Sequence, residues 1–345
     1  MLQYVGLGIM VALIAYISVA ATRVWMHRQQ ILDIPNDRSS HSHPTPRGGG
    51  LVIVVLSTIG LLVAWFLYPV WSFPTLCTGL AGIWLVAAVS WMDDLRSLSN
   101  RVRFTAHTLA GILIIVAFGS WRIVNIPQVG PIDLAWLGLP ITFVWMVGLT
   151  NAYNFMDGID GIAGGQAVVA GLGWVIVGLI TDQPLIAVFG TFVAASSLGF
   201  LGHNWPPARI FMGDVGSAFL GFVFAFMAVA ASRTDPRLAV VGIILVWPFV
   251  FDSGFTFFRR LLNRENVFSA HRSHLYQRLV IAGYSHRFVS SLYIGLAIIG
   301  LLLALGWVQD FPFSAVGITV IIPLLCLALW LFVVRTEALY RWVSA

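Results

Sequence analysis

The sequence contains no lysine, and all 19 of its basic residues are arginine. This absence excludes a Schiff-base lysine and the lysine of a nucleotide-binding P-loop. Cysteine is almost as scarce: Cys77 and Cys326 both lie in apolar runs, with no CxxC pair or Cys/His cluster. Neither a disulfide framework nor a zinc site is therefore predicted.

Charge of either sign is also scarce. Only 10% of the 345 residues are charged, against about 25% in soluble globular domains, and 59% are hydrophobic. These figures exclude a water-soluble globular protein and predict an integral membrane protein. The net charge of +5 would suggest a nucleic-acid partner in a soluble chain. No nucleic-acid partner is predicted here, because the position of the arginines relative to the membrane matters more.

Windows of about 20 mostly apolar residues, the length that crosses a bilayer, predict an all-α integral membrane protein with about eleven transmembrane helices. The windows are 3–22, 48–69, 75–92, 104–120, 135–154, 159–180, 184–202, 215–232, 237–258, 288–308 and 313–334. The gaps are too short for a soluble domain, so residues 1–345 are predicted to form a single polytopic membrane domain. One gap, 121–134, is compatible with a short hairpin.

The arginines predict the orientation of these spans. All except Arg122, Arg233 and Arg237 lie in or beside gaps that follow odd-numbered spans. The first span has no positive residue ahead of it and is followed by Arg23 and Arg28. By the positive-inside rule, this distribution predicts an uncleaved first helix, an N-terminus outside and a C-terminus in the cytoplasm.

The polar clusters also follow odd-numbered spans and therefore meet on the predicted cytoplasmic face. They are DRSSHSHPTPRGGG (37–50), DDLRS (93–97), NAYNFMDGIDG (151–161), GHNWPPARIFMGD (202–214) and HRSHLYQR (271–278). Ionisable groups at the edge of a membrane bundle are candidates for function. We therefore expect one active site on this face.

Asp93 and Asp94 are adjacent acids at the C-terminal end of a predicted span, where the helix dipole disfavours anions and the two charges repel. A cation must offset this repulsion. Paired carboxylates suit Mg²⁺, which binds through one or two carboxylates plus substrate phosphates. The alternative is a solvated helix end with a local pair to Arg96.

A second group of candidates is Asn151, Asn154, Asp157 and Asp160, which recur every three residues. On a helix this spacing places them in one polar stripe. Capping of the next helix by Asp157 or Asp160 is the alternative. Capping leaves the two asparagines without a role.

Asp214 directly precedes another predicted span, within FMGDVGS. N-capping is a strong alternative there, because an aspartate can accept hydrogen bonds from the free N–H groups of the first helical turn. Asn204 and Arg209 crowd the same edge of the membrane and have no role in capping. This helix start also suits an Mg²⁺–phosphate complex.

Two further segments carry candidates. Arg47 suits bidentate phosphate contact, and Gly48 and Gly49 beside it have N–H groups that an anion can approach closely, although a flexible entry loop explains these glycines equally well. His271 and His274 can bind a phosphoryl group, transfer protons or ligate a metal, and an ordinary polar loop is the alternative.

Asp252 lies inside a predicted span, near its cytoplasmic end. An unpaired charge at that depth is costly. We therefore expect Asp252 to face the polar site or to pair with an arginine.

Taken together and in this order, the motifs resemble the polyprenyl-phosphate N-acetylhexosamine-1-phosphate transferases of glycosyltransferase family 4. The resemblance spans roughly residues 33–287 and is carried by DD at 93–94, NAYNFMDGIDG at 151–161 and PPARIFMGDVGS at 206–217. The segments that end in GGG and begin with HRSH look like the branch that initiates O-antigen synthesis.

The resemblance implies transfer of a HexNAc-1-phosphate from a UDP-HexNAc to undecaprenyl phosphate in the lipid of the bacterial inner (cytoplasmic) membrane. The products would be undecaprenyl-diphosphate-HexNAc and UMP, which initiates O-antigen or a related polysaccharide. Mg²⁺ is the implied cofactor, with Mn²⁺ as the alternative, and a homodimer is allowed but not required. The implied catalytic residues are Asp93, Asp94, Asp157, Asp214, His271 and His274, with Asp214, Asp93 and Asp94 as metal ligands. The implied substrate-binding residues are Arg47, Gly48, Gly49, Asn151, Asn154, Asp160, Asn204, Arg209, Arg272 and Arg278.

The sequence departs from the family's pattern at Ser97, where many relatives have a third acid, and at Arg272 and Ser273, within the family's histidine cluster. The missing lysines weaken assignment to the peptidoglycan branch. The sugar is left open among GlcNAc, FucNAc and QuiNAc. Direct attack by the polyprenyl phosphate, with Asp93 assisting, and a two-step route through Asp214 also both stay open.

Two other classes of membrane protein compete with this interpretation. A transporter would place its ionisable residues near the bilayer midplane, whereas here they gather at one face. A CDP-alcohol phosphotransferase would carry a long acidic signature on a single segment, which this chain lacks.

Overall fold

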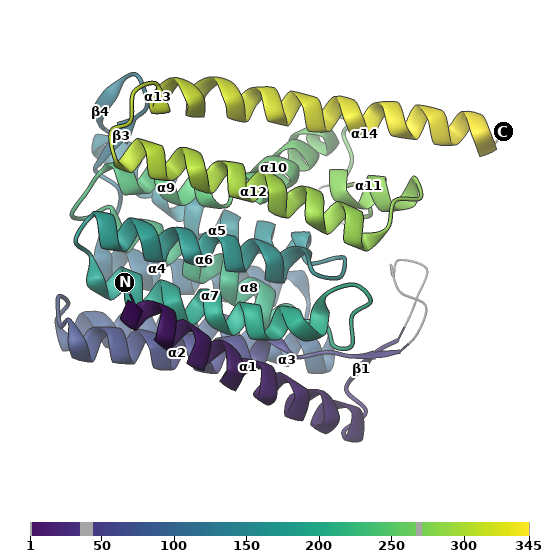
Figure 1. The fold of residues 1–345 in the computed structure, drawn as a ribbon, viewed down its shortest axis with the longest axis horizontal. Helices are drawn as coiled ribbons and strands as arrows, with labels where there is room; N and C mark the ends of the chain where they lie inside the picture. The colour runs from purple at the N-terminus through teal and green to yellow at the C-terminus, as the bar shows by residue number, and fades with distance from the viewer. Residues whose placement is uncertain (1, 35–43, 267–270, 345) are drawn as a thin grey trace.

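The structure is a computed structural model that describes residues 2–34, 44–266 and 271–344, and it is almost entirely helical (Figure 1). Within these ranges, ten helices are long and apolar enough to cross a membrane, and one bent pair makes eleven if it is counted as one span. The prediction of an all-α multi-pass membrane protein with about eleven spans is therefore confirmed.

The spanning helices are α1 (Leu2–Arg28), α2 (Gly50–Leu67), α3 (Phe73–Arg96), α4 (Asn100–Phe118), α5 (Gly138–Met156), α6 (Ile162–Ile180), α7 (Pro184–Asn204), α8 (Asp214–Ala231), α12 (His286–Val308) and α14 (Ile322–Ser344). The shorter helices are α9 (Arg237–Leu245), α10 (Trp247–Leu262), α11 (Leu275–Ile281) and α13 (Ser314–Val316). A 3₁₀ turn, Ala135–Leu137, precedes α5, and a π-helical turn, Gly317–Ile321, precedes α14.

Several helices begin where the sequence supplies a capping signal. The Ser72 hydroxyl accepts a hydrogen bond from the N–H of Thr75 at the start of α3, and the Ser285 hydroxyl accepts one from Phe288 at the start of α12. Pro184 begins α7, at a position where its missing N–H costs nothing.

Helix α8 lies at the centre of the bundle. Within the protein, 94% of its membrane-spanning window is buried, against 17% for α1 and for the C-terminal span that includes α14. Figure 1 shows α1 and α14 on opposite edges of the bundle. The first residue of α8, Asp214, therefore lies among helix ends and not on the lipid-facing surface.

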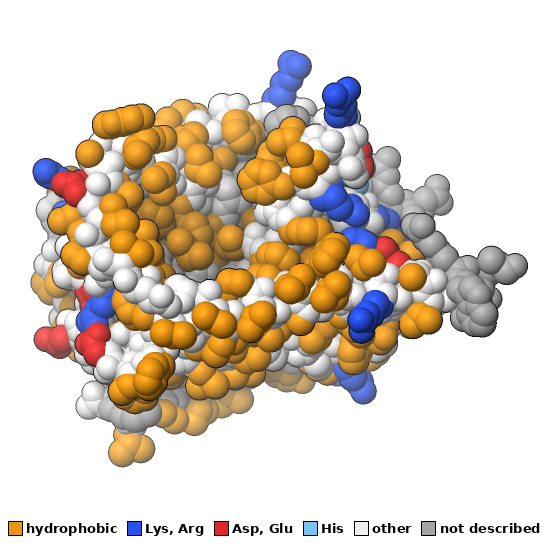
Figure 2. All heavy atoms as spheres, turned by 90° about the horizontal axis from the view of Figure 1, so that it is seen from above, with side chains coloured by type: hydrophobic (Ala, Val, Ile, Leu, Met, Phe, Trp, Pro, Cys, Tyr) orange, Lys and Arg blue, Asp and Glu red, His pale blue; other side chains and the backbone are white. Residues whose placement is uncertain are grey.

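The surface is mostly apolar between two charged ends, and arginines gather at the end where α14 finishes (Figure 2). We call this end the arginine-rich face, and it comprises the C-terminal ends of α1, α3, α5 and α7 and the start of α8. An apolar belt between charged ends is the surface expected of a protein that spans a bilayer.

The predicted span 237–258 is not a single straight helix. Helices α9 and α10 meet at Val246 with a bend of 76°. Pro248 lies in the first turn of α10, where proline has no N–H to donate to the preceding turn and its ring excludes a continuous helix. The bend carries α10, and with it Asp252, to the arginine-rich face at a steep angle.

The short hairpin expected at 121–134 is confirmed. Strand β3 (Ile123–Ile126) pairs antiparallel with β4 (Gly130–Asp133). A second antiparallel pair, β1 (Leu32–Asp33) with β2 (Thr45–Pro46), was not predicted. Residues 37–43 of the predicted 37–50 cluster lie outside the described residues.

Candidate active site

The helices α2 and α8 begin side by side on the arginine-rich face. The N–H groups of Gly49 and Gly50 donate to the carbonyls of Phe211 and Met212, both at 2.9 Å. A Cβ on Gly50 would lie 2.3 Å from the Cα of Gly216, so only glycine permits this approach. Gly49 and Gly50 therefore have a packing role, and the Gly49 N–H that was expected to approach an anion is already used inside the protein. The predicted contact of Gly48 with phosphate stays a prediction.

Asp94 caps helix α8 from across the bundle. Its Oδ1 accepts the N–H of Asp214 at 2.9 Å and its Oδ2 accepts the N–H of Val215 at 3.0 Å. The Asp94 side chain is buried, and Gly213, which precedes the helix, has a φ of 77° and space for no Cβ beside that carboxylate. The capping role considered for Asp214 thus belongs to Asp94, and the Asp214 side chain is left for other contacts.

Arg103 joins the two other acids of this cluster. Its Nη1 donates to Asp93 Oδ2 at 2.9 Å and to Asp214 Oδ2 at 3.1 Å. Asp93 Oδ1 also accepts the N–H of Leu98 at 2.5 Å, because Ser97 turns the chain in the left-handed conformation at the end of α3. Ser97 therefore serves the backbone turn that holds Asp93.

The sequence analysis missed Arg103. It lies in α4, ten residues after Asp93, with no polar periodicity to distinguish it from other arginines beside that span. The sequence offered one signal for Arg103: it lies in the first turn of the helix that follows the DDLRS loop, and this places it near the arginine-rich face. Its contact with Asp214, 111 residues away in the chain, depends on tertiary packing.

The predicted Asn151–Asp160 stripe is helical only in part. Asn151 and Asn154 lie in the last turns of α5, but the helix ends at Met156, so Asp157 and Asp160 lie in the turn beyond it and do not continue the helical face. Asn154 Nδ2 donates to Ser217 Oγ at 3.0 Å, and Asn151 Oδ1 lies 3.3 Å from His107 Nδ1. The predicted common face of the stripe is confirmed for these two residues by their contacts, although their contact with substrate stays a prediction.

Asp157 directly follows α5. Among the described residues its side chain makes no hydrogen bond or ion pair. Burial, together with the neighbouring charges of Asp214, Asp94 and Asp160, raises the pKa of the Asp157 carboxyl well above its usual range. A cation bound beside Asp157 would offset the excess negative charge and stabilise its ionised form.

Asp160 and Asn204 hold backbone segments together. Asp160 Oδ2 accepts the N–H of Ala208 at 3.0 Å, while Asn204 accepts the N–H of Gly161 at 2.9 Å and donates to the carbonyl of Ile210 at 3.0 Å. These contacts fix the segment before α8 against the turn after α5. The side chain of Arg209, in that same segment, is exposed.

The HRSH motif begins α11, and Asp252 of α10 anchors it. His274 Nδ1 lies 3.2 Å from Asp252 Oδ1. Of the two alternatives expected for Asp252, pairing with an arginine is not seen among the described residues, and the carboxylate instead faces the polar HRSHLYQR cluster. His271 Nδ1 contacts Ser273 Oγ at 2.9 Å. Burial, then the neighbouring His274 and nearby arginines, lower the pKa of His271 to about 4.

The arginines near this motif differ in what they contact. Arg278 donates from Nε and Nη2 to the two carboxylate oxygens of Glu337 on α14, at 2.6 and 2.5 Å, so its charge is largely taken up inside the protein. Arg272 is partly buried beside the histidines. Arg47, at the start of α2, donates from Nη2 to the backbone carbonyl of Asp94, and its Nε is buried with no hydrogen-bond partner.

The acidic cluster fits a divalent cation that shares its coordination with substrate. Among the described residues, no three His, Cys, Asp or Glu side chains form a ready-made metal cage. Mg²⁺, however, typically takes one or two carboxylates and fills its remaining positions with phosphate and water. Asp157, which has no partner, and Asp214 provide hard oxygen donors of this kind, whereas each oxygen of Asp94 already accepts a backbone N–H.

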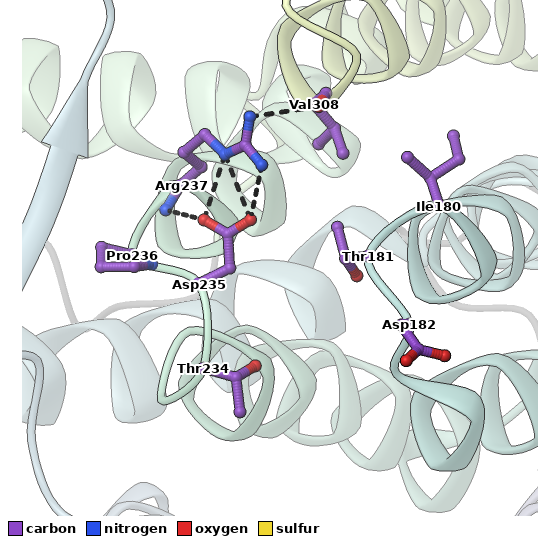
Figure 3. A pocket seen from close by; sticks show the side chains of 8 residues that line it. All are labelled: Ile180, Thr181, Asp182, Thr234, Asp235, Pro236, Arg237 and Val308. Carbon is purple, nitrogen blue, oxygen red and sulfur yellow. Dashed lines mark hydrogen bonds and ion pairs between the residues drawn. The ribbon is translucent and has the colours of Figure 1, made fainter.

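The cavity drawn in Figure 3 lies at the opposite end of the bundle from this cluster. It measures about 460 Å³ and is lined by residues of the α6–α7 and α8–α9 turns and by Val308. Arg237 there is held by Asp235 and Asp310, at 2.9 and 3.1 Å. None of the predicted reactive residues lines this cavity. The acidic cluster around Asp214, and not this cavity, is therefore the candidate active site.

Comparison with known proteins gives consistent matches. The profile of the family described as glycosyl transferase family 4 matches residues 76–232. A probable undecaprenyl-phosphate N-acetylglucosaminyl 1-phosphate transferase of Bacillus subtilis is 32% identical over 259 residues, which cover 74% of this chain and 71% of the relative. A decaprenyl-phosphate N-acetylglucosaminephosphotransferase of Mycobacterium leprae is 30% identical, with 81% and 77% covered. A phospho-N-acetylmuramoyl-pentapeptide-transferase of Synechococcus is 31% identical, with 86% and 88% covered.

Proposed function

The chain belongs to glycosyl transferase family 4, and from that premise we propose that it transfers a HexNAc-1-phosphate from a UDP-HexNAc to undecaprenyl phosphate, releasing UMP. The coarse reaction, transfer of a sugar-1-phosphate to a polyprenyl phosphate, follows from the family and from the names of the relatives. The identity of the sugar, the bacterial inner membrane as location and the initiation of O-antigen or a related polysaccharide belong to the proposal.

One observation carries the proposal: Asp157, which makes no hydrogen bond or ion pair with a described residue, lies near the charges of Asp214 and Asp94. Arg103 in turn bridges Asp214 to Asp93. Such a site combines excess carboxylate oxygen with guanidinium groups at the edge of a membrane bundle. A water-soluble diphosphate and a lipid phosphate can both reach that edge. Their reaction concentrates negative charge at one phosphorus, so neutralisation of charge is the main requirement.

In the proposed reaction, an oxygen of undecaprenyl phosphate attacks the phosphorus that carries the sugar. The bond from that phosphorus to the bridging oxygen breaks, and UMP leaves with this oxygen. One diphosphate linkage replaces another. A phosphomonoester with a second pKa near 6 is largely ionised at neutral pH, so it needs only a weak base. Asp93 suits the role of positioning the attacking phosphate and accepting its remaining proton.

Mg²⁺, when bound, would neutralise part of the diphosphate charge. Asp214 and Asp157, with Asp93, are the residues that would hold it. Arg103 and Arg47 would contact the phosphates, because both guanidinium groups lie at the acidic cluster. Phosphoryl transfer of this kind depends chiefly on positioning and on electrostatic stabilisation.

The test is to incubate the purified protein with Mg²⁺, undecaprenyl phosphate and a panel of UDP-sugars, and to identify the released nucleotide. We expect UMP with at least one UDP-HexNAc, and at least roughly 100-fold less of it from an Asp214→Asn variant that folds normally. Release of UDP with a monophosphate-linked lipid would show attack on the anomeric carbon and contradict the proposal. A product only from UDP-MurNAc-pentapeptide would reassign the substrate to the peptidoglycan branch.

A further inference from the structure

Among the described acids outside the cluster around Asp214, Asp252 is the most completely buried. Its side chain is 0% exposed. Its two oxygens accept hydrogen bonds from five groups and from no arginine. These are His274 Nδ1 at 3.2 Å, Leu275 N at 2.8 Å, Tyr276 N at 3.1 Å, Tyr293 Oη at 2.5 Å and Thr256 Oγ1 at 3.3 Å. So many donors offset the cost of burying a carboxylate within a membrane protein.

Three of these donors belong to consecutive residues at the start of α11. The backbone N–H groups of Leu275 and Tyr276 fix where the helix begins, and the ring of His274 is drawn to the same carboxylate. A carboxylate that already accepts two backbone N–H groups can only accept again, so the proton of the imidazole lies on Nδ1. Among the described residues, Nε2 of His274 makes no hydrogen bond.

Helix α11 is tied to the segment that carries Asp157. Tyr276 Oη donates to the carbonyl of Phe155 at 2.9 Å. A Cβ on Gly158 would lie 2.1 Å from that same hydroxyl oxygen, so the tyrosine packs directly on the turn. The orientation of His274 is therefore fixed relative to the acidic cluster through a short chain of contacts.

We propose that Asp252 is a positioning residue for the transfer reaction: it holds His274 by its Nδ1–H, which leaves Nε2 as the ring atom that faces the substrate and, once it too carries a proton, donates a hydrogen bond to a substrate phosphate. This inference rests on the proposed function. It assigns a task to an aspartate that touches neither substrate nor metal. Carboxylates that orient metal-binding histidines in this way typically change activity by about 10- to 100-fold when they are lost.

The first measurement is the tautomer itself, by nitrogen NMR of protein labelled with ¹⁵N-histidine. The His274 signals are assigned by their absence from a His274→Gln variant. We expect Nδ1 to carry the proton in the wild-type protein and this signature to be lost in Asp252→Asn. A wild-type His274 protonated on Nε2 with a bare Nδ1 would overturn the proposal, and this result needs neither activity nor a folded Asp252 variant.

The second measurement separates positioning from stability by a double-mutant cycle. We expect Asp252→Asn to lower kcat by about 10- to 100-fold and to have no further effect in a His274→Gln background, because both changes remove the same contact. The matched control is Thr256→Val, which removes a weaker donor to the same oxygen and should leave kcat near the wild-type value. Additive losses in the double variant would mean that Asp252 acts without His274 and would refute the proposal.

The two measurements also separate this proposal from the proposed function. A wild-type protein that releases no UMP from any UDP-sugar would contradict the proposed function. The NMR spectrum of that same protein would still decide whether Asp252 holds the Nδ1 proton of His274.

Discussion

Asp94 and Asp252 are two buried aspartates that use the same device in two regions of the protein. Each lies on a membrane helix near the arginine-rich face, and each accepts two consecutive backbone N–H groups at the start of another helix. They differ in what they place. Asp94 fixes the start of α8, whose first side chain is the acid Asp214, whereas Asp252 also holds the ring of His274.

The comparison shows how a membrane protein can place reactive groups without lysine. A buried carboxylate accepts hydrogen bonds from the first N–H groups of a helix, which otherwise have no partner in the helix. The cost of burying the carboxylate and the cost of leaving those N–H groups unpaired are therefore both offset. The side chain at the start of that helix, Asp214 in one case and His274 in the other, then has a fixed position. The aspartate that holds the start of a helix and the group proposed to act at the substrate are thus different residues.

The largest effect that tests this comparison is expected from Asp214→Asn. The backbone N–H of residue 214 still reaches Asp94, so the fold should survive. The lost side-chain charge removes a partner of Arg103 and a proposed ligand of Mg²⁺. We expect transfer to fall by roughly 100-fold or more, equivalent to several kcal/mol of charge stabilisation. The assay is initial-rate transfer with measured protein stability.

Asp182→Asn is the matched control for this variant, because Asp182 lies in the α6–α7 turn at the opposite end of the bundle. It should be nearly silent. An Asp214→Asn enzyme with full activity and unchanged Mg²⁺ dependence would leave Asp157 and Asp93 as the proposed ligands.

Asp94→Asn should reduce stability as well as activity. An amide can accept at only one end, so either Asp214 or Val215 loses the acceptor for its N–H. Leaving one buried donor without a partner costs about 1–3 kcal/mol. We expect a lower unfolding temperature in detergent and slower transfer. A variant that loses activity with unchanged stability would mean that Asp94 acts on substrate directly, and would break the analogy with Asp252.

Gly213→Ala tests the same cap from the other side. Gly213 has φ 77° and ψ 164°, a region almost restricted to glycine, and a new Cβ would lie 2.7 Å from Asp94 Oδ2. Together these should destabilise the protein by about 1–3 kcal/mol. The control is Gly148→Ala in α5, where nothing lies within 4 Å of the added Cβ. Thermal unfolding of the two variants measures the difference, and equal melting temperatures would contradict the strained cap.

The smallest effect is expected from Glu337→Gln. This change weakens the bidentate pair between Glu337 and Arg278, which joins α14 to α11. Partly exposed ion pairs usually contribute less than about 1 kcal/mol. We expect a small decrease in unfolding temperature and transfer near the wild-type rate. A large loss of transfer would show that α14 controls the histidine motif more strongly than this single pair suggests.

The sequence predicted the spans well because lipid imposes a simple rule of length and apolarity on each helix. Because the polar clusters all follow odd-numbered spans, the sequence predicted that Asp93, Asp157 and Asp214 lie on one face. The structure places them together on that face. The bend at Pro248 carried a visible signal, a proline inside a predicted span. Its consequence for Asp252 depended on where α11 packs.

The contacts inside the site were less accessible to sequence reasoning. Asp94 was predicted to bind metal, which stays untested, and its capping of a helix that begins 120 residues later could not be inferred from local spacing. Arg103 had no local pattern at all. Hydrogen bonds between distant side chains and backbone depend on how helices pack, and one sequence read alone contains no direct record of that packing.

The Arg103 bridge also has a thermodynamic consequence. One guanidinium nitrogen is shared between Asp93 and Asp214, so the site is partly neutralised by its own arginine before any ligand arrives. A divalent cation bound by these carboxylates, as proposed, would free Arg103 for a phosphate, and a phosphate that drew Arg103 away would expose the carboxylates to a cation. Each ligand would then favour the binding of the other, and by linkage the two affinities would rise by the same factor.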